Sequence, residues 1–180
     1  MGLLILCSGQ GGQTPEMIGH LLADPLTAGT CIELGRALPG DFSTVAADPQ
    51  RCFANRFAQP LICHYQMSVW SALAASGIRP AVVAGYSVGE LAAWGVAGAL
   101  SATDVLRAAM LRAAAMDTHA PAACGMLAVR GVRLAVIEAA ANANGAAIAI
   151  RNGADHAVLA GPIAALEAVQ GALSESTAAH

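Results

Sequence analysis

Short continuous runs of hydrophobic residues mark two places where this chain is expected to form strands. The first run, residues 3–7 (LLILC), ends at a glycine-rich segment, and the second, residues 82–84 (VVA), ends at the sequence G-Y-S-V-G. A brief apolar run bounded by turn residues is typical of a strand. We therefore predict two strands in the first half of the chain, each followed at once by a tight turn.

Proline, glycine and capping signals predict four helices in the first 120 residues. Proline at a first helical position opens two of them, and an Asp three residues after Ser101 makes an acidic capping box for another. Residues 36–52 are richer in Pro, Gly, Asp and Ser and are expected to form an irregular connection. The helices are predicted to start near Thr14 and to cover about residues 60–76, 87–98 and 101–116.

The predicted elements become shorter beyond a composition break at residues 119–121. A β-α-β-β-α series is expected there, over about residues 126–129, 132–143, 146–150, 157–160 and 163–173. The Asn-Gly pair at residues 152–153 is a typical turn signal between two strands. Because such a series normally ends with one more strand, the strand at 126–129 is expected to have an unprotected edge.

Charge and composition exclude several classes of function. The net charge is −3, with nine arginines, no lysine and no basic cluster, so nucleic acid is not an expected partner. Residues 60–78 carry no charge and could span a bilayer, but a histidine, a glutamine and three serines among them favour a buried helix. The first apolar run lacks a basic flank, which argues against a signal peptide and predicts a cytoplasmic location.

The cysteines and histidines follow no pattern of a disulfide framework or a metal site. The five cysteines include no C-x-x-C pair and are odd in number, and the five histidines show no ligand spacing. We expect buried structural cysteines and no metal. No catalytic base is expected among His20, His64, His119 and His156.

Ser87 lies between two glycines where a predicted strand turns into a helix. In that geometry the glycines avoid Cβ clashes, the hydroxyl is exposed, and the following N–H groups point at whatever the serine attacks. Ser87 is therefore a candidate nucleophile. The alternative is a serine with a purely structural role in a glycine-rich turn. Glu90, in the first helical turn, is expected to be structural because a carboxylate there favours the helix dipole.

Five short motifs together resemble one family. They are G-Q-G-G-Q at residues 9–13, N-R-F-A-Q-P at 55–60, G-Y-S-V-G-E at 85–90, R-A-A-A-M at 112–116, and Asn152 with V-L-A-G at 158–161. The set resembles the malonyl-CoA:acyl carrier protein transacylases of fatty acid biosynthesis, in which such motifs occur in this order and at similar separations. The resemblance covers essentially all 180 residues.

The resemblance implies a role for each candidate site residue. Ser87 would carry the acyl group as an ester, and the backbone N–H groups of Gln10 and Val88 would form the oxyanion hole. Arg112 would bind the free carboxylate of malonyl, and Gln10 would also contact the substrate. A planar guanidinium suits a carboxylate better than a lysine does. The alternatives are a tight turn at Gln10 and, for Arg112, a solvated helix arginine paired with an acid such as Asp117.

The same resemblance implies the substrate, the partner and the fold. It implies malonyl-CoA as substrate, no bound cofactor, and an acyl carrier protein with a phosphopantetheine-type thiol as partner. The expected fold class is α/β. Residues 1–121 would form part of a large α/β-hydrolase-like domain with a parallel central sheet. Residues 122–180 would form an incomplete ferredoxin-like (βαββα) subdomain.

Two departures from the family pattern stand out. Tyr86 precedes the serine where the family usually has histidine, which resembles the subgroup that serves malonate decarboxylase. The family's catalytic histidine lies downstream of residue 180, so the resemblance implies a chain truncated at the C-terminus, with Ser87 lacking its base. His180 is not expected to replace that histidine.

Three other functions are alternatives. A serine hydrolase of the α/β class could pair Ser87 with Asp155 and His180, but this leaves Gln10 and Arg112 unexplained. A patatin-like lipase would need an Asp-Gly motif, which the sequence lacks. The chain could also be a noncatalytic partner that binds an acyl carrier protein.

Overall fold

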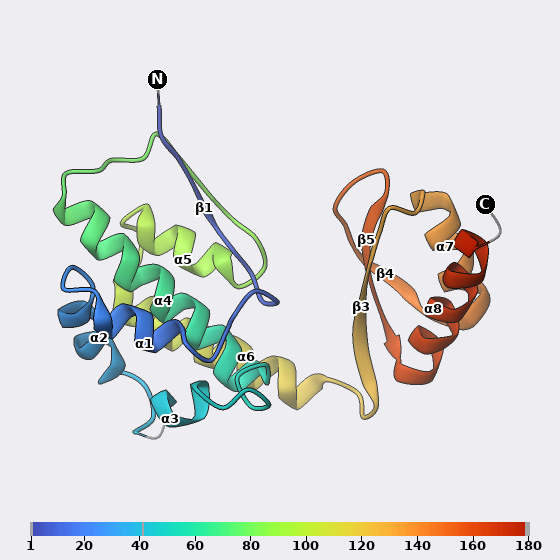
Figure 1. The fold of residues 1–180 in the computed structure, drawn as a ribbon, viewed down its shortest axis with the longest axis horizontal. Coiled ribbons are helices and arrows are strands. Elements are labelled where there is room, and N and C mark those ends of the chain that lie inside the picture. Colours follow the sequence, from blue (N-terminus) through green and yellow to red (C-terminus); the bar gives the residue numbers. More distant parts are fainter. Residues whose placement is uncertain (1, 41, 179–180) are drawn as a thin grey trace. The chain divides into compact units, whose positions relative to one another are not determined.

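The computed structural model describes residues 2–40 and 42–178, and these form two compact units with separate hydrophobic cores (Figure 1). The first unit is Met1–His119 and the second is Ala120–His180. The composition break in the sequence predicted this division after residue 121. Each unit combines helices with a sheet, which confirms the predicted α/β class.

The sheet of the first unit consists of two parallel strands that end at the same edge. Strand β1 (Leu4–Cys7) pairs with β2 (Val82–Gly85) in a register that opposes Leu4 to Val82 and Cys7 to Gly85. Alternate side chains pack against the core, whereas Leu6 on the other face is 71% exposed. The two turns that follow the strands therefore lie side by side at the carboxyl edge of the sheet.

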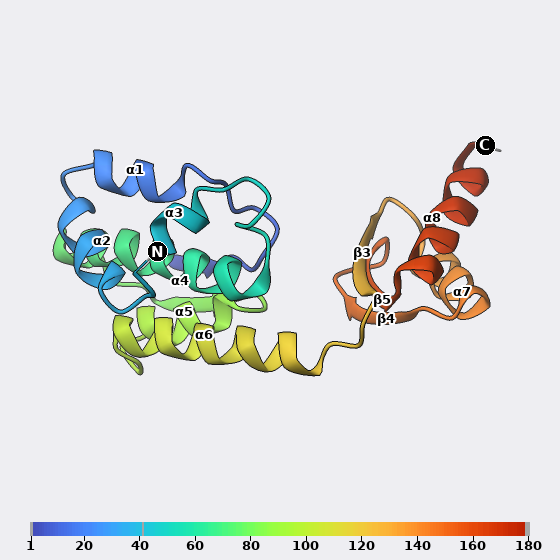
Figure 2. The same cartoon turned by 90° about the horizontal axis from the view of Figure 1, so that it is seen from below.

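Six helices accompany this sheet within the described part of the first unit. They are α1 (Met17–Ala23), α2 (Ala28–Gly35), α3 (Phe42–Ala46), α4 (Asn55–Ala75), α5 (Gly89–Val96) and α6 (Ala102–His119). Figure 2 shows the full length of α6, which packs against α4 and α5. The predicted cap of α6 is confirmed, since the Asp104 N–H donates to Ser101 Oγ at 3.1 Å.

Three predictions about these helices were wrong. Helix α1 begins at Met17 with Glu16 at its N-cap position, so Pro15 precedes the helix instead of opening it. Helix α4 begins at Asn55 rather than at Pro60, because buried apolar residues such as Phe57 and Leu61 lie on both sides of the proline and their packing outweighs its cost. The stretch 36–52 is not wholly irregular, because it contains α3. Phe42, Val45 and Ala46 of that helix have the spacing of one helical face, and all three are buried.

The charge-free stretch of residues 60–78 forms most of α4, as the prediction of a buried helix requires. Its polar members His64 and Ser68 lie in the interior of the unit. Across residues 2–40 and 42–178, none of the helices combines the length and the apolarity that a membrane crossing needs.

The second unit confirms the predicted β-α-β-β-α series. Its elements are β3 (Cys124–Arg130), α7 (Leu134–Asn144), β4 (Ala147–Arg151), β5 (His156–Pro162) and α8 (Ile163–Ala178). The strands are antiparallel in the order β3-β5-β4, and both helices lie on one face of the sheet (Figures 1 and 2). Strand β3 pairs on one side with β5 and lies at an edge of the described sheet, as expected.

Gly89, the first residue of α5, lies where the backbone of that helix meets the end of β1. A Cβ on Gly89 would collide with the carbonyl oxygens of Cys7 and Ser8. We expect Gly89→Ala to lower the free energy of unfolding by about 1–3 kcal/mol, because the two carbonyl groups belong to the backbone and can shift only if the end of β1 is distorted. Gly19→Ala in α1 is the matched control, since a Cβ there meets nothing within 4 Å. That control should stabilise by about 0.5–1 kcal/mol. Urea unfolding measures both, and equal effects would contradict the prediction.

Candidate active site

Ser87 lies on a strained turn at the carboxyl end of β2. Its φ of 55° is in the left-handed region, where a residue with a Cβ costs about 1–2 kcal/mol. A Cβ on Gly85 would collide with the backbone of Gly89 and Glu90, so the turn closes this tightly only with glycine there. The sharp strand-to-helix turn predicted from the sequence is thus confirmed.

The loop after β1 packs directly against this turn. A Cβ on Gly9 would lie 2.8 Å from the Tyr86 carbonyl oxygen and 3.1 Å from Ser87 Cβ. The Tyr86 N–H donates to the Cys7 carbonyl at 3.0 Å, and Gln66 Nε2 donates to the Ser8 carbonyl and hydroxyl, both at 2.9 Å. These contacts fix the start of the glycine loop next to the serine.

The two backbone groups predicted to form an oxyanion hole lie on these neighbouring turns. Within the part of the chain that the structure describes, neither the Gln10 N–H nor the Val88 N–H donates to an internal acceptor. An oxyanion hole needs such unsatisfied donors beside the nucleophile. Gln10 also has a side-chain bond, from Nε2 to Asn55 Oδ1 at 3.0 Å.

Arg112 on α6 extends to the nucleophile. Its Nη2 lies 3.4 Å from Ser87 Oγ, and its Nη1 donates to Gln59 Oε1 at 2.7 Å. Asp117 instead accepts from Asn55 Nδ2 at 2.8 Å. The alternative of a solvated arginine paired with Asp117 therefore does not describe this structure, and the guanidinium is within reach of an acyl group on Ser87.

The polar residues that surround Ser87 and Arg112 had no predicted roles. Gln59 is fully buried and also contacts Met116, with 3.2 Å between Nε2 and Sδ. Its neighbour one turn earlier on α4 is Asn55, which bonds to Gln10. The sequence did contain a signal for these two residues. Asn55 and Gln59 have the i, i+4 spacing of one helical face, and an amide buried in an apolar helix needs hydrogen-bond partners.

Cys63 is a second nucleophilic group close to the turn. It is fully buried, and its thiol lies 3.8 Å from the Val88 carbonyl oxygen. Burial raises the pKa of the Cys63 thiol to about 12, reinforced by the nearby Cys7 and opposed by the charge of Arg112. The thiol therefore stays protonated at neutral pH and does not compete with Ser87, because the thiolate is the reactive form.

No histidine among the described residues hydrogen-bonds Ser87. Nε2 of His64 contacts the Cys31 carbonyl at 2.9 Å, and burial lowers the pKa of this imidazole. Nδ1 of His119 contacts the carbonyl of Ala115 within its own helix. Of the other residues in the hydrolase alternative, Asp155 belongs to the second unit and His180 lies outside the described residues.

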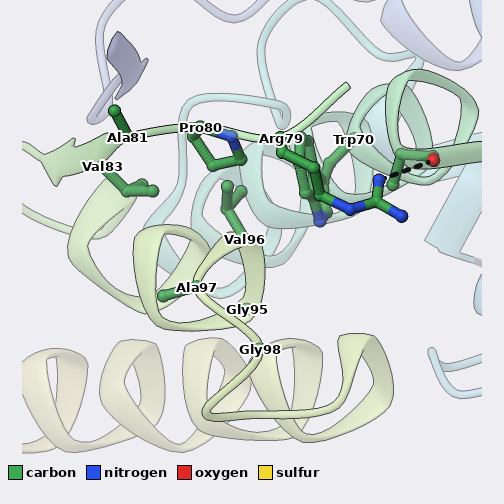
Figure 3. Close-up of a pocket in the computed structure, with 10 residues that line it drawn as sticks. Trp70, Arg79, Pro80, Ala81, Val83, Gly95, Val96, Ala97 and Gly98 are labelled. Atoms are coloured by element: carbon green, nitrogen blue, oxygen red, sulfur yellow. Dashed lines mark hydrogen bonds between the residues drawn. The ribbon is translucent and has the colours of Figure 1, made fainter. Parts of the chain in front are cut away.

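A cavity of about 640 Å³ in the first unit lies away from this chemistry. It is lined by residues at the end of α4, the start of β2 and the end of α5, among them Trp70, Arg79, Pro80, Val83 and Val96 (Figure 3). Ser87, Gln10 and Arg112 are not among its described lining residues. Ligands of open parallel sheets bind at the carboxyl ends of the strands, so we place the candidate site at Ser87 rather than in this cavity.

Comparison with a known protein family gives one match over nearly the whole chain. Residues 5–180 match the acyl transferase domain family. Among curated relatives, the polyketide synthase component of compactin nonaketide synthase from Penicillium citrinum is 30% identical over 94% of this chain and 6% of its own length. Orsellinic acid synthase from Emericella nidulans is 42% identical over 52% of this chain and 5% of its own length.

Solved structures share the fold of both units. The acyl-carrier-protein S-malonyltransferase from Burkholderia pseudomallei 1710b gives a TM-score of 0.83 at 27% identity, covering 98% of this chain and 60% of its own. The acyltransferase domain from the second module of the salinomycin polyketide synthase gives 0.80 at 32% identity, covering 98% and 42%. This chain therefore spans about 60% or less of the length of these proteins.

Proposed function

Because this chain belongs to the acyl transferase domain family, we propose that it carries the nucleophile and the substrate-selecting arginine of a malonyltransferase. The observation that supports this most directly is the 3.4 Å approach of Arg112 Nη2 to Ser87 Oγ. A strained serine elbow supplies a nucleophile, and a guanidinium within reach of the acyl group favours a carboxylated thioester.

In the proposed reaction Ser87 Oγ attacks the thioester carbon of malonyl-CoA. The new C–O bond forms, the C–S bond breaks, and coenzyme A leaves as the thiol after taking the proton that a general base removes from the serine. The backbone N–H groups of Gln10 and Val88 stabilise the oxyanion between these events. An acceptor thiol then attacks the ester and regenerates Ser87, so the transfer consists of two half-reactions. No cofactor is needed beyond the substrate.

We infer that the acceptor is a phosphopantetheine-type thiol on an acyl carrier protein. The similarity to the Burkholderia pseudomallei acyl-carrier-protein S-malonyltransferase supports this inference. Tyr86 before the nucleophile favours the carrier subunit of malonate decarboxylase, whereas the polyketide synthases among the relatives favour a carrier domain of such a synthase. Four of the five cysteines are buried as expected, whereas Cys124 at the start of β3 is exposed, so the expectation was wrong for that residue. All five are free, which is consistent with the reducing cytoplasm as the location.

We propose that the general base lies outside residues 1–180. The family resemblance puts the catalytic histidine downstream of residue 180, and no described histidine bonds to Ser87. Loss of a general base lowers such rates by several orders of magnitude. We therefore expect slow acylation by the chain alone, and a single turnover is the suitable readout.

Incubation of the chain with malonyl-CoA, followed by intact-mass and peptide analysis, tests the proposed function. We expect one malonyl group per chain, attached to Ser87, and less labelling with acetyl-CoA. Binding of a carrier protein without any acyl adduct would support the noncatalytic alternative. Hydrolysis of simple esters without labelling by malonyl-CoA would support a serine hydrolase.

A further inference from the structure

The glycine loop that provides the Gln10 N–H has few side chains by which it can be fixed. Gly9, Gly11 and Gly12 have no side chains, Gly11 has a φ of 120°, and a Cβ on Gly11 or Gly12 would meet nothing within 4 Å. Gln10 has the one side chain within residues 9–12. The contact of its amide therefore holds this loop together with one further bond, in which the Gly11 N–H donates to Oε1 of Gln13 at 2.8 Å.

That contact is the first link of a short chain of side-chain bonds. Gln10 Nε2 donates to Asn55 Oδ1 at 3.0 Å, and Asn55 Nδ2 donates to Asp117 Oδ1 at 2.8 Å. The three residues come from the loop after β1, the start of α4 and the last turns of α6. A second contact joins this loop to the segment just before α4, since Gln13 Nε2 donates to the Cys52 carbonyl at 3.5 Å.

The chemistry of the three groups fixes the direction of this chain of bonds. An ionised carboxylate can only accept, so Asp117 requires the NH₂ group of Asn55 to face it. The oxygen of the Asn55 amide then faces Gln10 and requires the NH₂ group of the Gln10 amide. Through this exposed bond to Asn55, Asp117 favours one orientation of the Gln10 amide, and among the described residues neither Asn55 nor Asp117 hydrogen-bonds Ser87.

We propose that Asn55, oriented by Asp117, is a positioning residue that presets the Gln10 N–H for the oxyanion. This rests on the function proposed above. Gln59, one turn later on α4, holds Arg112 in the same way. The facing surfaces of α4 and α6 therefore align both the oxyanion loop and the substrate arginine. A donor fixed before the reaction need not reorganise as charge develops, so its alignment lowers the barrier.

Single-turnover acylation of the chain by malonyl-CoA tests the proposal. Asn55→Ala should lower the maximal rate about 10- to 100-fold and change the half-saturating concentration less than about 2-fold, because the oxyanion exists only in the transition state. Asn144→Ala is the matched control, since that amide bonds to the Ala140 carbonyl in the other unit. We expect the control to leave the rate unchanged. An unchanged maximal rate in a folded Asn55→Ala variant would overturn the proposal.

A charge swap separates positioning from general damage to the fold. Asn55→Asp should be slow, because it places a carboxylate against Asp117 and removes the donor. The double variant N55D/D117N returns the donor to position 117 and leaves an acceptor for Gln10, so it should recover most of the lost rate. Failure of the double variant to recover, with its thermal unfolding restored to that of the wild type, would contradict the proposal.

NMR relaxation of the Gln10 and Gly11 amides provides a readout that does not depend on activity. We expect increased motion of both amides in Asn55→Ala and recovery in the double variant. If the wild type forms no adduct while these amides respond, the proposed function fails and the positioning of the loop stands. If the amides do not respond, the positioning role fails, whatever the activity of the wild type.

Discussion

Ser87→Ala is expected to abolish formation of the malonyl adduct, and this is the largest effect that we anticipate. The hydroxyl oxygen forms the new bond to the acyl group, and the buried thiol of Cys63 stays protonated and cannot replace it. Without the Ser87 hydroxyl no oxygen remains at this position to carry the acyl group, so no adduct should form at residue 87, however slowly the unmodified protein reacts. Intact-mass spectrometry after incubation with malonyl-CoA measures the result.

Two further variants show whether the loss reflects chemistry rather than unfolding. Ser87→Gly should lose the adduct equally but gain about 1 kcal/mol of stability, because glycine adopts the φ of 55° without strain. Ser43→Ala, on the exposed side of α3, should keep the adduct. A malonyl group that persists on the Ser87→Ala variant at another residue would contradict the assignment of the nucleophile.

The fold could be predicted from the sequence wherever local signals agreed with the packing. The two strands of the first unit, the capping box of α6 and the whole β-α-β-β-α series are of this kind. Prediction was wrong where tertiary packing outweighed a local signal. Pro60 lies inside α4 because the helix buries residues on both sides of it, and α3 forms in a polar stretch because three apolar residues share a face.

The sequence pointed to the residues of the candidate site but not to the bonds that connect them. The motif spacing pointed to Ser87, Gln10 and Arg112, and the structure brings Arg112 to the serine. The Asn55–Asp117 bond joins residues 62 positions apart, and the Gln10–Asn55 bond joins residues 45 apart. No local pattern contains such pairs, because they depend on how α4 packs against α6 and against the loop after β1.

Arg112→Ala is expected to change which acyl group the protein accepts. A guanidinium that binds a carboxylate through two charge-assisted hydrogen bonds gains about 1.5–3 kcal/mol from each, and acetyl-CoA offers no carboxylate. We expect the ratio of malonyl to acetyl transfer to fall by about 100-fold or more. Competition between the two thioesters for labelling of Ser87 measures this ratio in a single experiment.

The ratio is the suitable quantity because Arg112 also has a structural partner. Its removal leaves the buried oxygen of Gln59 without the 2.7 Å bond, which costs about 1–3 kcal/mol of stability whatever the substrate. This loss affects labelling by both thioesters and cancels in the ratio. Arg112→Lys keeps the charge but loses the planar fork, so it should retain part of the preference, about 10-fold below the wild type. An unchanged preference in the alanine variant would remove Arg112 from the substrate site and leave it a structural role beside Gln59.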